Sequence, residues 1–464
     1  MKALKFMILF IQVSVMLYAA GHKNIKKSFS IEPGKLIEIE TVSGLDINVK
    51  SWDKDEVYFD LRLKVTSSDE ELEAEYVEYF DIIEKHRNSK LVIKFDEEEV
   101  DGGWSFWDIF RGRFYFDFSK EIKGNIYVPR ANPLKADFKY SIIRLDDMLG
   151  EINLIGRSNE LYLNNCGNIF AIENDYGDNF ILNSGGELNL NSRSGNVTVD
   201  NFEGPIKIIA DYSKIDVRKV KGILDVKTRS ANVNVEDIDS DLKMSADYSD
   251  VIIKNINGFA DLKNRSGKFD VTNVKGIRID APYTTCNING VSGIKGKDIE
   301  ISDRSGHISI EKATGNVVID DSYSDITLKS IDGNVNLTSR SSTVIGSDIK
   351  GNWESGTNYC TIQLEKFSGK EIVITNRSDP VIIGILRVPE LVDIENDFGN
   401  IEFALPGSYN GEINLYVSHG EIKSGFPIKI KKGTNSSKVN EKLGNGNSKI
   451  ILRADHGSIY LEKN

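Results

Sequence analysis

The sequence is poor in cysteine, proline and histidine, and each shortage excludes a class of protein or site. Its 464 residues include only 3 cysteines, too few and too widely spaced for a disulfide framework or a zinc motif. Only 9 prolines stand against 39 glycines, so glycine must supply most of the turns. The 5 histidines include no pair at the spacing that places two ligands on one helix face. We therefore expect no metal and no cofactor.

The chain also lacks an excess of positive charge and, after its first 21 residues, any long apolar run. A formal net charge of −12 argues against a nucleic-acid partner, which would require a basic face. Residues 1–21 have the layout of a secretory signal peptide, with Lys2 and Lys5, an apolar run over 6–18 and small residues at 19–21. An uncleaved N-terminal anchor is the alternative, although the run is short for a membrane span. We expect an exported protein, in the periplasm, at the cell surface or outside the cell, with no transmembrane segment in the mature chain.

A turn tripeptide recurs along the middle of the chain, and tyrosine and arginine alternate at its centre. These centres are Tyr140, Arg157, Tyr176, Arg193, Tyr212, Arg229, Tyr248, Arg265, Tyr283, Arg304, Tyr323, Arg340, Tyr359 and Arg377. A second marker, glycine, falls on an 18-residue grid, which slips once at a small insertion near 294–302. Its positions are Gly204, Gly222, Gly258, Gly276, Gly315, Gly333, Gly351 and Gly369. Between the markers apolar and polar residues alternate, which is typical of strands that bury one face.

Short strands on this period, with no helix between them, cannot bury their apolar faces within one repeat, so the repeats must stack. The pattern predicts an all-β fold, a single-stranded parallel β-solenoid (β-helix) with rungs of about 18 residues. Strands over 28–66 and one short α-helix, from Ser68 to about Lys85, predict an N-terminal β cap. The predicted domains are a signal peptide at 1–21, the N-terminal strand and helix cap at 22–133, the regular solenoid at 134–384 and irregular C-terminal rungs with a cap at 385–464.

The repeat also assigns places to single residues. Cys166 and Cys286 fall on inward-facing positions and Cys360 on a turn, where free cysteine acts as a small buried apolar residue. His419 and His456 occupy the turn-marker position of the C-terminal rungs, which favours a structural role for both.

Because equivalent positions of successive rungs stack, the turn centres predict a column in which tyrosine and arginine alternate. Arginine stacks favourably on aromatic rings, and the alternation keeps like charges apart. These properties favour a structural role, in which the column holds one corner of the coil. The alternative is a recessed polar-aromatic stripe that binds a glycan or an anionic polymer.

The segment GGWSFWDIFRGRFYFDF, residues 102–118, departs most from the repeat. It is either a loop folded over the mouth of the solenoid or an exposed aromatic patch for a partner, a glycan or a membrane surface. The candidate binding residues in it are Trp104, Phe106, Trp107, Phe110, Arg111, Arg113 and Tyr115.

Three stretches carry a resemblance to a known family: FSIEPGKLIEIETVSGLDINVKSWDKDEVYF, SRSGNVTVDNFEGPIKI and RADHGSIYLEKN. They resemble a bacterial "putative adhesin" family of unknown function, made of exported β-strand repeat proteins. The resemblance implies a bacterial envelope protein. Its motifs belong to the fold, so it assigns no catalytic or binding residue.

No glycine-rich phosphate loop or nucleophile elbow is present, and the acidic residues are scattered, so we do not expect an enzyme. The prediction is a non-enzymatic binding, adhesion or scaffolding module at the bacterial cell envelope, with an unidentified envelope component, glycan or protein as its partner. Two alternatives remain open: a self-assembling structural protein, and a carbohydrate-active β-helix enzyme such as a polysaccharide lyase or hydrolase. The oligomeric state follows from none of these features.

Overall fold

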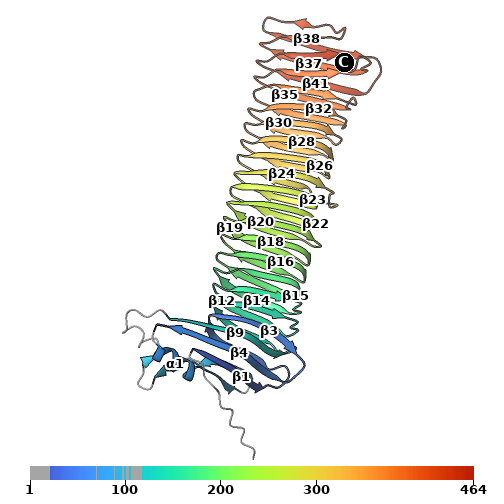
Figure 1. Ribbon diagram of the computed structural model, residues 1–464. Coiled ribbons are helices and arrows are strands. Elements are labelled where there is room, and N and C mark those ends of the chain that lie inside the picture. Colours follow the sequence, from blue (N-terminus) through green and yellow to red (C-terminus); the bar gives the residue numbers. More distant parts are fainter. Residues whose placement is uncertain are drawn as a thin grey trace, which may run out of the picture. The chain divides into compact units, whose positions relative to one another are not determined.

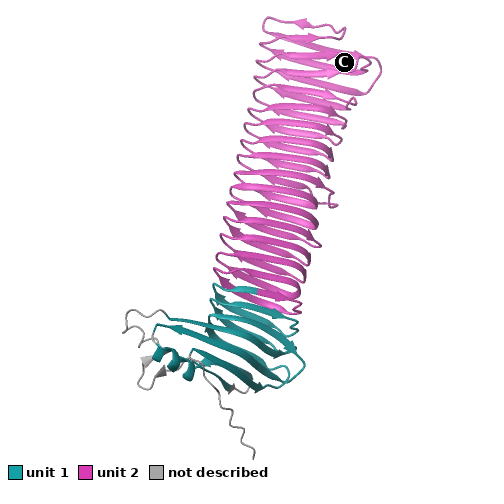
Figure 2. Cartoon of the chain, in the orientation of Figure 1, with its two compact units in different colours: residues 1–161 teal, residues 162–464 magenta. Residues whose placement is uncertain are grey.

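The computed structural model describes residues 21–68, 70–87, 89–96, 99–100, 104–105 and 118–463 (Figure 1). The chain forms two compact units, Met1–Leu161 (unit 1) and Tyr162–Asn464 (unit 2), which Figure 2 colours teal and magenta. The predicted signal peptide at 1–21 lies almost wholly outside the described residues, so export stays a prediction. The predicted domain boundaries likewise stay predictions.

Strands dominate both units. The strands before residue 165 are β1 (His22–Ser30), β2 (Leu36–Ser43), β3 (Leu45–Trp52), β4 (Glu56–Ser67), β5 (Asp81–Arg87), β6 (Lys90–Asp96), β7 (Glu99–Val100), β8 (Trp104–Ser105), β9 (Phe118–Pro129), β10 (Leu134–Lys139), β11 (Ile142–Asp146), β12 (Ile152–Arg157) and β13 (Glu160–Asn164). The strands after it are β14 (Ile169–Asp175), β15 (Asn179–Ser192), β16 (Asn196–Glu203), β17 (Ile206–Ala210), β18 (Lys214–Lys221), β19 (Leu224–Arg229), β20 (Asn232–Ile238), β21 (Leu242–Asp247), β22 (Ser249–Lys263), β23 (Gly267–Asp280), β24 (Thr284–Val291), β25 (Ile299–Ser302), β26 (His307–Thr314), β27 (Val317–Asp320), β28 (Asp325–Asp332), β29 (Val335–Ser339), β30 (Thr343–Ile349), β31 (Trp353–Thr357), β32 (Thr361–Phe367), β33 (Glu371–Asn376), β34 (Val381–Ile385), β35 (Leu391–Asn396), β36 (Ile401–Leu405), β37 (Gly411–Ser418), β38 (Ile422–Ser424), β39 (Lys431–Lys432), β40 (Ser436–Leu443), β41 (Ser448–Ala454) and β42 (Ile459–Lys463).

Unit 2 is a parallel β-solenoid. Through most of it each strand pairs in parallel with the strand two places along the chain, as β16 pairs with β18 and β18 with β20. The register advances by one period at each step, so that Val197 lies opposite Ile215 and Ile215 opposite Val233. The resulting coil of stacked rungs is visible in Figure 1. The fold class predicted from the period is therefore confirmed.

The interior of the coil is filled by the alternating apolar residues. In β18, Ile215, Val217 and Val220 are fully buried, whereas the intervening side chains reach the surface. All 3 cysteines are free and buried, as predicted. Burial raises the pKa of the thiol of Cys286, which disfavours the reactive thiolate form.

The glycine grid has a steric cause. A Cβ atom at Gly351 would lie 2.0 Å from the carbonyl oxygen of Gly333, and one at Gly333 would lie 2.0 Å from that of Gly315. The backbones of successive rungs touch at this corner, and a side chain has no room. Glycine is required here by close approach, because neither Gly333 nor Gly351 has a positive φ.

Other corners use left-handed backbone at residues that are not glycine. Tyr212 has φ 53°, and Lys219, seven residues later, has φ 52°. The position of Lys219 is filled by Asp237 and Asn255 in the next two rungs, with φ 58° and 57°. Because asparagine and aspartate tolerate this conformation better than most other residues that have a side chain, their recurrence at the corner is a local signal for the turn of the coil.

Unit 1 contains the strands and the helix that the sequence predicts near the N-terminus. β4 pairs antiparallel with β1 and with β9, while β3 pairs in parallel with β9 and with β11. The only helix among the described residues is α1 (Glu70–Tyr79), whose Tyr76 ring lies 5.3 Å from that of Phe118. No helix in the described part of the chain has the length and hydropathy needed to cross a membrane. The predicted N-terminal strands with one helix are confirmed among the described residues.

The helix is shorter than predicted. It ends at Tyr79 instead of continuing to about Lys85, because the chain from Asp81 enters β5, which pairs antiparallel with β6. Ile82 is buried in that pairing, and strand formation there outweighs the helical spacing of the apolar residues.

At the C-terminal end the spatial order of the rungs departs from the chain order. β41 pairs in parallel with β35 on one side and with β37 on the other, and β42 pairs in the same way with β36 and β38. The C-terminal rung, β41–β42, therefore lies between two rungs that precede it in the sequence. The far edge of β37 pairs antiparallel with β40, which in turn pairs with β39. This hairpin covers an edge that would otherwise be free to pair with another chain.

Candidate functional site

The predicted aromatic binding segment is only partly described. Trp104 lies in β8, which pairs antiparallel with β7. The other candidates lie outside the described residues: Phe106, Trp107, Phe110, Arg111, Arg113 and Tyr115. A binding role for this segment stays a prediction.

The tyrosines of the turn column stand at the surface of unit 2. They are between 44% and 56% exposed, so each phenol group is neither fully buried nor fully in solvent. The tyrosines of this set are Tyr176, Tyr212, Tyr248, Tyr283, Tyr323 and Tyr359. In unit 1, Tyr140 is exposed in the same way. A corner lined by half-exposed phenol groups is thus available to a ligand along the coil.

Several arginines of the column lie over the ring of the tyrosine in the preceding turn. The distances from the guanidinium carbon to the ring centre are 5.8 Å for Arg193 and Tyr176, 5.3 Å for Arg229 and Tyr212, 5.8 Å for Arg265 and Tyr248, and 5.8 Å for Arg377 and Tyr359. Such contacts are within the range of cation–π attraction. In the first pair the guanidinium also donates a hydrogen bond of 3.1 Å to the phenol oxygen. The predicted stacking between rungs is present in these pairs.

Carboxylates beside the column offset its positive charge. Arg229 Nη2 lies 3.5 Å from a carboxylate oxygen of Asp211, and Arg265 Nη2 lies 3.9 Å from one of Asp247. These exposed ion pairs contribute little to stability. They matter for binding, because they add carboxylate groups to the hydroxyl and guanidinium groups of the column and reduce its positive charge.

Beneath the turns runs an inner column of buried polar residues. Asn264 and Asn376 precede their arginines, and the side chain of Asn264 accepts a hydrogen bond from Ser266 N. Asp303 occupies the same position, and its carboxylate accepts hydrogen bonds from the backbone N–H of Arg304 and from Ser324 Oγ. Burial, and secondarily the nearby Asp321, raise the pKa of Asp303. This inner column satisfies the backbone of the turn and is closed to a substrate.

The outer column changes composition in the C-terminal rungs, where Phe398, His456 and His419 stack. The ring centroids of Phe398 and His456 are 5.2 Å apart, and those of His456 and His419 are 4.8 Å apart with an angle of 7° between the planes. This order follows the spatial order of the strands, because β41 lies between β35 and β37.

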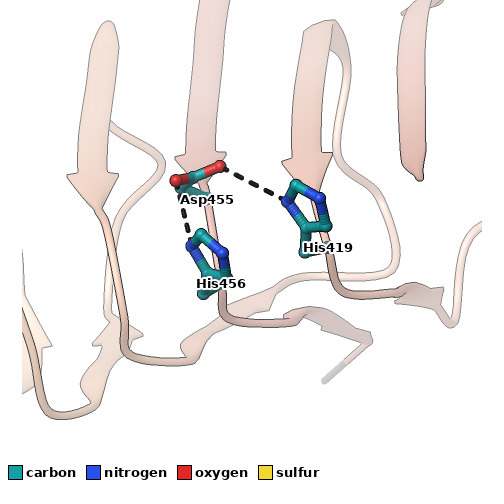
Figure 3. A group of neighbouring side chains, drawn as sticks. All are labelled: His419, Asp455 and His456. Carbon is teal, nitrogen blue, oxygen red and sulfur yellow. Dashed lines mark ion pairs between the residues drawn. The ribbon is translucent and has the colours of Figure 1, made fainter.

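Asp455 lies beside the two imidazoles, which belong to neighbouring turns (Figure 3). Its carboxylate is 3.0 Å from His456 Nδ1 and 4.0 Å from His419 Nδ1. Ser418 Oγ is also 2.9 Å from His419 Nδ1. The three residues together present two imidazole nitrogens and a carboxylate to one point, a set of groups that could hold a metal ion.

Sequence reasoning placed His419 and His456 at the turn marker and predicted a structural role for both. The stacking supports the turn position. However, the sequence did not predict that the two histidines lie together with Asp455, because 37 residues separate the histidines and the rung order is not the chain order. The only local signal was the shared pattern SHG and DHG.

Comparisons with known proteins bear on the family. Residues 275–462 match the family model described as Toastrack DUF4097. No curated protein matches the chain. A crystal structure of a "putative cell adhesion protein" from Clostridium sporogenes is similar at 9% sequence identity, covering 95% of this chain and 100% of that one, with a TM-score of 0.14. Through residues 275–462 the chain is thus similar to the Toastrack DUF4097 family, which confirms the resemblance to a "putative adhesin" family of unknown function.

Proposed function

We propose that this chain is an exported, non-enzymatic binding and adhesion module of the bacterial cell envelope, and that it binds an extended glycan along the tyrosine–arginine column. The observation that carries the proposal is the half-exposure of the column tyrosines, which repeats from turn to turn of unit 2. Half-exposed phenol groups can contact a ligand while they also stack within the column.

The contacts of the column favour hydrogen bonding over ring stacking. Guanidinium groups lie over one face of several rings, so that face is closed to a sugar, whereas the half-exposed phenol hydroxyls can hydrogen-bond to a ligand. The side chains of Arg229 and Arg265 are more than half exposed and retain N–H groups for sugar hydroxyls. Because Asp211 and Asp247 offset their charge, a neutral glycan is favoured over a polyanion.

The repeat of the column suits a polymer. Stacked strands are roughly 4.8 Å apart, so equivalent tyrosines recur every two rungs, at roughly 10 Å. This is of the order of the length of a disaccharide unit. Weak contacts at each repeat would add along one chain of the ligand and give avidity without a deep pocket.

The test is retention of the purified full chain on insoluble envelope polysaccharide and on immobilised neutral glycans. The column variant is Tyr176→Asn, Tyr212→Asn and Tyr248→Asn together, because asparagine tolerates the left-handed backbone at these positions. The control variant removes exposed apolar groups away from the column, at Phe170, Ile223 and Tyr416, by substitution with alanine.

We expect the column variant to bind at least about tenfold more weakly and the control variant to bind as the wild type does. Equal binding by both variants, or no binding by the wild type, would remove the proposal. Release of reducing ends from the bound glycan would instead indicate the carbohydrate-active enzyme. The β39–β40 hairpin covers the edge of β37, which disfavours self-assembly at the C-terminal end. Light scattering that shows particles growing with protein concentration would instead support the self-assembling structural protein.

A further inference from the structure

We propose that His419, Asp455 and His456 bind one divalent transition metal ion of the Zn²⁺ class, which joins the C-terminal rung to its neighbour. The inference goes beyond the proposed function, because the site lies apart from the tyrosine–arginine pairs. It rests on ligand chemistry, on the distances between ligand atoms and on the rung order.

The ligand set selects the kind of metal. Two imidazole nitrogens and one carboxylate suit Zn²⁺ and its neighbours, whereas Mg²⁺ and Ca²⁺ prefer oxygen ligands alone. Three protein ligands would leave a further coordination position for water or for an external group. We propose no reaction at this position.

The side chains lie close enough to share one ion after a rotation of their rings. One potential ligand atom from each residue can be chosen so that all three lie within 4.8 Å of one another. Two ligand atoms bound to one tetrahedral Zn²⁺ ion lie about 3.4 Å apart, since each bond is about 2.0–2.1 Å. The two rings are nearly parallel, with 7° between their planes, so their in-plane lone pairs do not converge, and metal binding requires at least one imidazole to rotate out of the stack. About half of each of the three side chains is exposed, so no core packing opposes this rotation.

The hydrogen bonds of the site are compatible with metal binding. His419 Nδ1 is 2.9 Å from Ser418 Oγ, and this hydroxyl can donate to the neutral imidazole. A metal ion would take over the nitrogen lone pair and release the serine to solvent. His456 Nδ1 and Asp455 are 3.0 Å apart, so the carboxylate is already next to the first ligand.

The rung order gives the metal a structural consequence. His419 follows β37, whereas Asp455 and His456 follow β41, and these strands are direct neighbours although separate in the chain. A metal bound to all three residues would cross-link the inserted C-terminal rung to β37. It would therefore oppose withdrawal of β41–β42 from its place between two earlier rungs.

The experiment is a calorimetric Zn²⁺ titration of the full chain after treatment with EDTA, followed by a thermal scan with and without Zn²⁺. We expect one Zn²⁺ per chain, a higher thermal midpoint with Zn²⁺, and no effect of Mg²⁺. His419→Ala, His456→Ala and Asp455→Asn should each weaken binding by about tenfold or more. The matched control is His307→Ala, which removes a histidine from β26 and should bind Zn²⁺ as the wild type does.

Two further measurements keep the proposal falsifiable. Circular dichroism of the EDTA-treated variants shows whether each still folds, and Zn²⁺ should slow hydrogen exchange in β37 and β41 but not in β26. Absence of Zn²⁺ binding by the wild type would overturn the site. Binding that the three variants leave unchanged would also overturn it, because the metal would then sit adventitiously on other surface groups.

Discussion

Replacing Gly351 with alanine should destabilise the solenoid locally and strongly. The new Cβ would lie 2.0 Å from the carbonyl oxygen of Gly333 and 2.2 Å from its carbonyl carbon. Restoring an acceptable separation requires the two rungs to part by about 1 Å. The shift strains the hydrogen bonds on either side, from Lys350 N to Ile331 O at 3.0 Å and from Val335 N to Asn352 O at 2.8 Å.

The magnitude follows from those contacts. Overpacking costs about 1–3 kcal/mol, and each weakened backbone hydrogen bond costs about 0.5–1.5 kcal/mol. We therefore expect Gly351→Ala to lose about 2–6 kcal/mol of local stability. Because long repeat arrays do not unfold in one cooperative step, the quantity to measure is the opening free energy from hydrogen exchange in the rungs that contain Gly333 and Gly351.

The matched control is Gly356→Ala in the neighbouring strand β31. A Cβ at Gly356 would meet no atom within 4 Å, and its φ is not positive, so alanine should stabilise by about 0.4–1 kcal/mol. If the two variants differ by less than about 1 kcal/mol, close approach of stacked backbones is not what the glycine grid serves.

Three further predictions test the columns and the core. Burial raises the pKa of Asp303, so its ionised carboxylate lowers the stability of the fold increasingly as the pH rises above the ordinary aspartate range. Asp303→Asn should therefore have a higher thermal midpoint than the wild type at pH 7, and the difference between the two midpoints should narrow toward pH 4. The control Asp320→Asn, at an exposed position, should have the same midpoint as the wild type. Arg229→Ala should lower the local opening free energy measured by hydrogen exchange by less than about 1 kcal/mol, because its contact with the Tyr212 ring is exposed. A larger loss would make the column a principal support of the fold. A thiol-alkylating reagent at pH 8 should modify Cys286 far more slowly in the native chain than in the unfolded chain. Equal rates would show that the thiol is not buried as described.

Much of the fold was predictable because the same pattern of apolar and turn residues recurs in each rung of the solenoid. Alternation around Ile215 and Val217 predicted a strand with one buried face, and its recurrence after 18 residues predicted that rungs stack. The same stacking predicted that Arg229 would meet Tyr212. The α1 boundary was less predictable, because the apolar spacing continues past Tyr79 while pairing with β6 decides the conformation.

The candidate sites were also predictable only in part from the sequence. Periodicity identified the tyrosine–arginine column and its members, but their exposure depends on how the corner packs, and only the structure shows the tyrosines in solvent. The aromatic candidates of residues 102–118 lie mostly outside the described residues and stay predictions.

By itself the sequence determined the rung length, the inward and outward faces, the glycine corner and the residues that alternate along the turn. Each of these follows from local alternation repeated at a constant period. Only the tertiary structure decided that β41–β42 lies between β35–β36 and β37–β38, and hence that His456 and Asp455 meet His419. The reason is physical: rungs of equal period offer equivalent edges, so local pattern cannot select a neighbour. That choice depends on packing and on the end that the β39–β40 hairpin must cover.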